Sequence, residues 1–189
     1  LAKSGKIVYV YSIIPFVTMR CFEQVRLDLA YNNTQVRLVG IGAGMTYGPL
    51  GPTHHAYEDI AIMRAIPNMK IICPGDPIET KELVCQTYDM EGPIYIRLAK
   101  NGEPNIHKTN SIIEFGKAIE VIKGNDLILI TTSNMLETGN IWAEEWKKEG
   151  VGVTLVSMHT IKPLDQKFIE ALIDRKLPII TLEEHNVIG

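Results

Sequence analysis

Short apolar segments rich in β-branched and aromatic residues alternate along this chain with longer segments whose apolar residues recur every three or four positions. The short segments predict strands that are buried on both faces, and the long ones predict helices. We expect strands at residues 7–11, 36–41, 69–73, 94–98, 118–122, 127–131, 151–156 and 177–182. We expect helices at residues 16–30, 54–66, 78–88, 136–149 and 163–175. Such alternation is typical of βαβ units and predicts α/β domains with mainly parallel sheets between layers of helices.

One mostly polar stretch interrupts the alternation. Residues 100–112 include Gly102 and Pro104, which is typical of a linker. The sequence therefore predicts two consecutive α/β domains of the three-layer type, at residues 1–105 and 112–189. The first residues look like the last turn of a helix, and the last ones follow directly on a strand. We therefore expect both domains to be truncated at their outer ends and the chain to be part of a longer protein.

Composition excludes several classes of protein. Of the 189 residues, 46% are hydrophobic and 22% are charged, which is enough for a buried core. A net charge of −3 offers no basic surface for nucleic acid, and no apolar run is long enough to cross a membrane. The three cysteines, Cys21, Cys73 and Cys85, are odd in number and widely spaced. We expect them to be reduced thiols in a cytoplasmic protein, with no disulfides and no zinc site.

The densest group of unusual residues is a loop rich in glycine and proline that follows the expected strand at 36–41. It covers residues 42–55 and ends in two adjacent histidines. Ligands of open parallel sheets bind at the carboxyl ends of the strands, where this loop would lie. Glycine lets a backbone approach a ligand closely, and proline stiffens the loop. The loop lacks the Gly-Lys-Ser/Thr ending of a P-loop and the third glycine of a dinucleotide-binding fingerprint.

We expect His54 and His55 to open the helix at 54–66, where two interpretations stay open. The positive end of the helix dipole would keep an imidazole neutral, and a neutral imidazole can accept a proton or bind a developing oxyanion. In the other interpretation Thr53 caps the helix and both histidines lie on a solvated surface.

A resemblance to a known family rests on four segments. Residues 51–59, Gly-Pro-Thr-His-His-Ala-Tyr-Glu-Asp, together with Met-Arg-Ala-Ile-Pro-Asn-Met at 63–69, resemble the pyrimidine-binding domain of transketolases. Residues 11–25 resemble the segment whose aromatic side chain stacks on the cofactor's pyrimidine. Met-His-Thr-Ile-Lys-Pro-Leu-Asp at 158–165, with the final segment 182–189, resembles the C-terminal domain of the same enzymes. The resemblance follows the family's order and covers nearly the whole chain.

The resemblance implies thiamine diphosphate and Mg²⁺ as cofactors of the full enzyme, and the transfer of a two-carbon unit between sugar phosphates. His54 matches the family histidine that faces the reacting carbons, so it is the expected catalytic residue. Phe16 and Ile14 are the expected contacts to the cofactor. Phe16 would offer its ring to the pyrimidine, while Ile14 and Val17 compete for the same family positions.

Three further residues are expected to bind the substrate. Arg20 stands where deoxyxylulose-phosphate synthases carry a substrate-facing arginine, and His55 follows the catalytic histidine. Lys100 matches a family arginine that grips the substrate phosphate, and a lysine there would act as a point charge. Leu50 stands where many transketolases carry an aspartate that contacts a sugar hydroxyl. Because leucine cannot accept that hydrogen bond, we expect an unusual acceptor.

Parts of the family's active site are missing from this chain. The catalytic glutamate of the family would precede Leu1, and the Gly-Asp-Gly motif that binds diphosphate and metal is absent. We therefore expect the chain alone to be inactive and to hold no metal. The full enzyme is expected to be a homodimer, or to pair this chain with one that carries an N-terminal diphosphate-binding domain.

Two alternatives stay open beside the transketolase reaction. Arg20 and the missing aspartate lean toward a 1-deoxyxylulose-5-phosphate synthase or the β subunit of a 2-oxo acid dehydrogenase. The segments at 63–69 and 158–163 lean back toward transketolase. The other alternative is a non-catalytic module for dimerisation or regulation.

Outside these motifs we expect structural roles. His107 is expected on the surface of the linker, and His159 is expected to cap a helix or contact a partner. Cys85, like Cys73, is expected in the core. Trp142 and Trp146 lie four residues apart on one expected helix, so we expect them to pack together.

Overall fold

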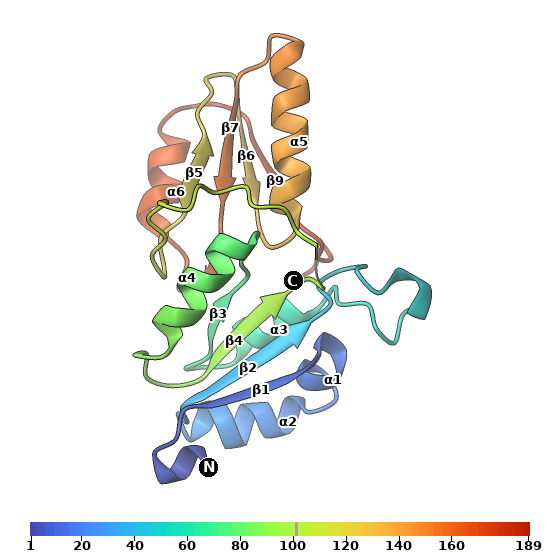
Figure 1. Cartoon of the computed structure of the whole chain (residues 1–189), viewed down its shortest axis with the longest axis vertical. Helices are drawn as coiled ribbons and strands as arrows, with labels where there is room; N and C mark the ends of the chain where they lie inside the picture. Colours follow the sequence, from blue (N-terminus) through green and yellow to red (C-terminus); the bar gives the residue numbers. More distant parts are fainter. Residues whose placement is uncertain (101) are drawn as a thin grey trace. The chain divides into compact units, whose positions relative to one another are not determined.

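The computed structural model describes residues 1–100 and 102–189, and its contacts divide the chain into two compact units (Figure 1). Unit 1 comprises residues 1–72, 84–100 and 184–189, and unit 2 comprises residues 73–83 and 102–183. Each unit is an α/β structure with a mainly parallel sheet, so the predicted fold class is confirmed. The domain boundaries expected from the sequence stay a prediction.

The sheet of unit 1 places three strand ends side by side. Its strands lie in the order β1, β2, β4, β3, and all neighbours in this series are parallel. They cover Val8–Ile13, Val36–Ile41, Ile94–Leu98 and Lys70–Ile72 respectively. In register, Ile13 of β1 lies opposite Ile41 of β2, which lies opposite Leu98 of β4. Whatever follows these three residues therefore leaves the sheet at the same edge.

The helices of unit 1 are short. They are a 3₁₀ turn η1 (Ala2–Ser4), α1 (Ile14–Thr18), α2 (Phe22–Gln24), a π-helical segment η2 (Val25–Tyr31), a 3₁₀ turn η3 (Gly48–Leu50) and α3 (Asp59–Ala65). The continuous helix expected at 16–30 is thus wrong, because the chain breaks between α1 and α2. Side chains compete there for backbone carbonyls: the Thr18 hydroxyl donates to Ile14 O at 2.7 Å, and the Cys21 thiol donates to Phe16 O at 3.3 Å. Helix α4 (Pro77–Thr87) contributes residues to both units.

Unit 2 is a sheet with a helix packed on each face. Its strands are β5 (Ile119–Ile122), β7 (Val153–Ser157), β6 (Leu127–Thr131) and β9 (Ile179–Leu182), in that order, and only β5 runs antiparallel to its neighbour. Adjacent residues of β6 point to opposite faces. Leu129 packs with Leu136 of α5 (Met135–Lys148), whereas Ile128 packs with Leu172 of α6 (Gln166–Ile173). The short strand β8 (Thr160–Lys162) was not predicted.

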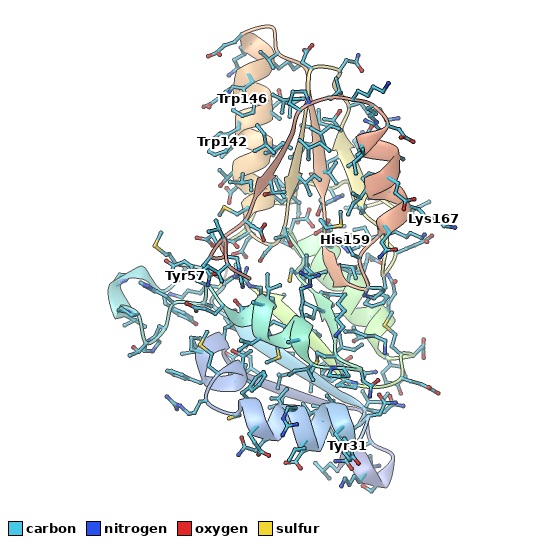
Figure 2. All side chains as sticks on the ribbon, turned by 180° about the vertical axis from the view of Figure 1, so that it is seen from behind. Tyr31, Tyr57, Trp142, Trp146, His159 and Lys167 are labelled. Atoms are coloured by element: carbon cyan, nitrogen blue, oxygen red, sulfur yellow. The ribbon has the colours of Figure 1, made fainter. Side chains whose placement is uncertain are left out.

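Two smaller expectations concern exposed and packed side chains. The rings of Trp142 and Trp146 lie along one side of α5 with centroids 5.9 Å apart, so their predicted packing is confirmed (Figure 2). All three cysteines are thiols, but Cys85 is exposed on α4 and not buried in the core. No helix among the described residues is long and apolar enough to cross a membrane.

Candidate active site

A loop at the carboxyl edge of the unit 1 sheet carries the predicted histidines. It covers residues 42–55 between β2 and α3, and we call it the site loop. The amide of Gly42 donates to Leu98 O at 2.9 Å and to Ala99 O at 3.0 Å, and the amide of Ala43 donates to Leu98 O at 3.1 Å. These bonds tie the start of the loop to the end of β4 and to the residue immediately before Lys100.

Five side chains form a continuous series of ring and cation contacts at this edge. The Arg20 guanidinium lies 4.2 Å from the centre of the Phe16 ring, and that ring lies 5.1 Å from the His54 ring in an edge-on arrangement. The Tyr47 ring lies 6.0 Å from His54, and the Lys100 ammonium lies 5.4 Å from the centre of Tyr47. We call this series, Arg20, Phe16, His54, Tyr47 and Lys100, the aromatic row.

The aromatic row unites four of the residues selected from the sequence and adds one that was missed. Arg20, Phe16, His54 and Lys100 come from positions as far as 84 residues apart in the chain, yet each touches a neighbour in the row. Tyr47 is the residue that the sequence reasoning missed. Its signal in the sequence was an aromatic residue among glycines and prolines, where a ring has few structural reasons to occur.

The histidines do not open a helix, so that expectation is wrong. Helix α3 begins at Asp59, because two amides of the expected first turn are used elsewhere. His54 N donates to Gly51 O and Ala56 N donates to Gly44 O, both at 3.0 Å, and these bonds fold the end of the site loop back on its start. The dipole argument for His54 therefore fails. Its half-buried imidazole is oriented by Thr53, whose hydroxyl lies 2.9 Å from Nδ1.

The other predicted site residues lie around the row without joining it. His55 Nε2 lies 3.3 Å from Gly48 O, and the His55 ring contacts Tyr57. Ile14 is fully buried in a cluster with Ala43 and Ala56, beneath the site loop. Leu50 lies in η3 at the tip of the loop and is 55% exposed.

A buried ion pair anchors the loop from below, and the sequence reasoning missed it. Arg97 Nε donates to Asp59 Oδ2 at 2.9 Å, the Tyr95 hydroxyl donates to the same oxygen at 2.7 Å, and Arg97 Nη2 donates to Ala56 O at 3.2 Å. Arg97 and Asp59 are both buried, and each is satisfied by these contacts. The signal was a charged residue inside an expected buried strand.

The last residues of the chain also pack on the site loop within unit 1. Arg97 Nη2 donates to Glu184 O at 3.0 Å, and Asn186 N donates to Tyr57 O at 3.0 Å. The Glu184 side chain lies directly against Gly44, whose positive φ of 56° and missing Cβ make room for it. Glycine is therefore required at position 44.

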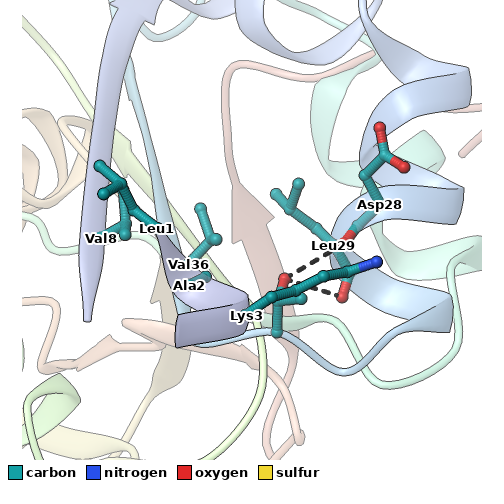
Figure 3. Close-up of a pocket in the computed structure, with 8 residues that line it drawn as sticks. Leu1, Ala2, Lys3, Val8, Asp28, Leu29 and Val36 are labelled. Atoms are coloured by element: carbon teal, nitrogen blue, oxygen red, sulfur yellow. Dashed lines mark hydrogen bonds between the residues drawn. The ribbon is translucent and has the colours of Figure 1, made fainter. Parts of the chain in front are cut away.

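A separate cavity in unit 1 lies away from the aromatic row (Figure 3). Its volume is about 370 Å³, and it is lined by Leu1, Ala2, Lys3, Val8, Asp28, Leu29, Thr34 and Val36. The Thr34 hydroxyl is directed to the carbonyl oxygens of Asp28 and Leu29 at 3.3 and 3.2 Å. None of the predicted site residues lines this cavity.

Unit 2 contains a buried cluster of ionisable side chains that includes His107. His107 Nδ1 lies 3.2 Å from Asp76 Oδ2, and His107 Nε2 lies 3.6 Å from Glu79 Oε1. The Ser157 hydroxyl donates to Glu79 Oε1 at 2.6 Å. His107 is only 8% exposed, so its expected place on the surface is wrong. The cause is Asp76, whose carboxylate accepts the amides of Ile106 and His107 and holds this segment inward.

The cluster shifts the pKa values of its members. Burial alone would raise the pKa of Asp76, but hydrogen bonds from His107 and from the amides of Glu79 and His107 lower it to about 2. Burial would lower the pKa of His107, yet its hydrogen bond to Asp76 and the charges of Glu79 and Asp76 raise it. Burial, and then the charge of His107, lower the pKa of His159 to about 4. His159 is fully buried and caps no helix, since the Asp165 carboxylate caps α6.

No group of three or more His, Cys, Asp or Glu side chains is placed to hold a metal ion in the described part of the chain.

The fold and the site together define a class. Two consecutive α/β units, with ring and cation side chains gathered where parallel strands end, are typical of ligand-binding α/β proteins. Comparison with known families makes this specific: residues 1–104 match the transketolase pyrimidine binding domain, and residues 116–189 match the transketolase C-terminal domain. The chain belongs to the transketolase family.

Individual relatives agree with this assignment. One of the two subunits of an apulose-4-phosphate transketolase from Phocaeicola vulgatus is 35% identical over 100% of this chain and 61% of its own length. A 6-deoxy-6-sulfo-D-fructose transketolase subunit from a Clostridium species is 33% identical over 100% of this chain and 59% of its own. A split-gene transketolase solved as an inactive beta4 tetramer is 29% identical, with a TM-score of 0.87 over 100% of this chain and 61% of that one. The chain thus spans about three fifths of the length of these relatives.

Proposed function

We propose that this chain forms part of the active site of a thiamine-diphosphate-dependent transferase that moves a two-carbon unit between sugar phosphates. The observation that carries the proposal is the aromatic row, in which His54 lies edge-on to Phe16 at the carboxyl edge of a parallel sheet. Membership of the transketolase family supports it. The named relatives also act on sugars, as their names state.

The residues present fit a planar heterocycle at Phe16. Phe16 is only half-buried, so part of its ring is available for stacking, and Ile14 and Ala43 provide a rigid floor beneath the loop. Thiamine diphosphate bound here would supply the carbanion that attacks a ketose carbonyl. We assign its diphosphate and Mg²⁺ to a domain outside this chain.

His54 handles the proton in this proposal. Its Nδ1 is paired with the Thr53 hydroxyl, so Nε2 is the nitrogen that would bond to a substrate hydroxyl or oxyanion and exchange a proton with it. Lys100 would attract the substrate phosphate as a point charge, and Arg20 and His55 would contact the substrate on either side.

Partner and location belong to the same proposal. The active protein is a homodimer, or this chain paired with another that carries the diphosphate-binding domain. The share of the relatives' length that the chain spans supports the pairing. The domains run over residues 1–105 and 112–189. A cytoplasmic location rests on the three thiols.

One observation favours a second reaction on the same site. The Arg20 guanidinium stacks on Phe16 and so lies within the aromatic row, as expected for a deoxyxylulose-phosphate synthase. In that case the donor is a 2-oxo acid, and its use releases CO₂. The two reactions are therefore separated by the donor.

The test is a panel of donors and acceptors assayed with the full-length protein and its partner, in the presence of thiamine diphosphate and Mg²⁺. We expect turnover of a ketose donor without CO₂ release, and His54→Ala should lower kcat by about 10²-fold or more. Thr53→Val, which removes only the hydroxyl beside Nδ1, is the matched control and should give a smaller loss. Turnover of a 2-oxo acid alone would select the second reaction, and no turnover of any donor would refute the proposal.

A further inference from the structure

Tyr47 lies between the two residues with the clearest assigned roles. Its ring is edge-on to His54 at 6.0 Å, and the Lys100 ammonium lies over it at 5.4 Å. An ammonium within about 6 Å of an aromatic ring centre is attracted by the negative face of that ring. The Tyr47 hydroxyl makes no hydrogen bond among the described residues, so the contacts of this side chain are those of its ring.

The site loop is shaped around this ring. Gly42 has a φ of 93°, and a Cβ added there would overlap the Tyr47 ring. The ring therefore rests directly on the backbone at the start of the loop. The same Gly42 amide is bonded to Leu98 O and Ala99 O, so the surface under Tyr47 is joined to the strand end that precedes Lys100.

We propose that Tyr47 is a positioning residue for the substrate's phosphate: its ring holds the Lys100 ammonium at a fixed place relative to His54. This inference rests on the proposed function, in which His54 serves the reacting carbons and Lys100 serves the phosphate. A lysine side chain has a long flexible stem and is a point charge, so it gains more from a surface that restricts it than an arginine fork would. The Tyr47 ring is that surface.

The inference separates the ring of Tyr47 from its hydroxyl. Tyr47→Phe keeps the ring, so the KM for a phosphorylated aldehyde acceptor should stay within about twofold of the wild type. Tyr47→Leu removes the ring and should raise that KM about three- to fivefold, the range that a partly exposed cation–π contact supports. The KM for the same acceptor without its phosphate should stay unchanged in both variants. A general disturbance of the loop would affect both acceptors alike.

A double-mutant cycle tests whether Tyr47 acts through Lys100. In a Lys100→Met background, Tyr47→Leu should have no further effect on the KM for the phosphorylated acceptor. The proposal is overturned if the two substitutions add independently, if Tyr47→Phe is as harmful as Tyr47→Leu, or if both acceptors lose affinity equally. Should Tyr47→Leu fail to fold, Tyr47→Gln also lacks a ring and replaces it in the cycle.

Binding of inorganic phosphate distinguishes failure of this inference from failure of the proposed function. Calorimetric titration of phosphate into the assembled protein needs no turnover. We expect Tyr47→Leu and Lys100→Met to weaken phosphate binding by similar factors, and Tyr47→Phe to preserve it. If no donor is turned over but these affinities behave as expected, the transfer reaction is wrong and the phosphate site stands. Equal phosphate affinity in all variants contradicts the role of Tyr47.

Discussion

At the scale of single residues, His107 couples the charge state of unit 2 to its folding. The side chains that face it are Asp76, Glu79 and His159, and the first two raise its pKa above the usual value of 6.5. A histidine whose pKa is raised by folding stabilises the folded state fully below pH 6.5, and this contribution is lost as the pH rises through the raised value. His159 has its lowered pKa near 4, so its own contribution changes only below pH 6.5.

We therefore predict that unit 2 loses stability as the pH rises from 6.5 toward 8.5, with a slope of at most about 1.4 kcal/mol per pH unit. His107→Gln should remove this slope. The measurement is urea unfolding followed by tryptophan fluorescence, because both tryptophans of the chain lie on α5 and report on unit 2 alone. A variant with the same pH dependence as the wild type would show that His107 is not the titrating group.

Residues with a role in chemistry were easier to find from the sequence than residues that hold them in place. His54, Phe16, Arg20 and Lys100 stood out by residue type, by their place after strands and by resemblance to a family. Asp59 and Arg97 escaped because a buried ion pair depends on two side chains that are 38 residues apart meeting in three dimensions. No local pattern encodes such a meeting.

At the scale of elements, the site loop depends on one glycine more than on its neighbours. Gly42→Ala places a Cβ against the Tyr47 ring at a backbone φ of 93°. We predict that it destabilises the protein by about 1–3 kcal/mol and raises the KM for the phosphorylated acceptor. Gly48→Ala is the matched control in the same loop, since a Cβ there meets no atom within 4 Å. Its stability should stay within about 0.5 kcal/mol of the wild type in urea unfolding followed by circular dichroism. Equal effects of both substitutions would contradict this account of the loop.

Strands were predicted more accurately than helices, for a physical reason. The buried strands β2, β4 and β6 begin and end where their apolar runs do, because both faces of such a strand demand apolar side chains. The helices expected at 16–30 and 54–66 had suitable periodicity but were interrupted by hydrogen bonds from Thr18, Cys21 and the site loop. These bonds are set by tertiary structure, which periodicity does not report.

At the scale of the whole molecule, the sequence predicted two mainly parallel α/β structures because the alternation of strands and helices is strong. It did not predict that residues 73–83 belong with unit 2, since that grouping depends on contacts such as the one between Glu79 and Ser157. The proposed function also extends beyond this chain, because the residues for diphosphate and Mg²⁺ are assigned to another domain.

The central claim is that this chain supplies one part of a thiamine diphosphate site and needs the rest of the protein to act. The most direct measurement is ketose cleavage with saturating thiamine diphosphate and Mg²⁺, assayed with these 189 residues alone and with the complete protein. We predict cofactor-dependent cleavage by the complete protein and none by the 189 residues alone. Cleavage by the isolated chain, or cleavage by the complete protein without thiamine diphosphate, would contradict the account.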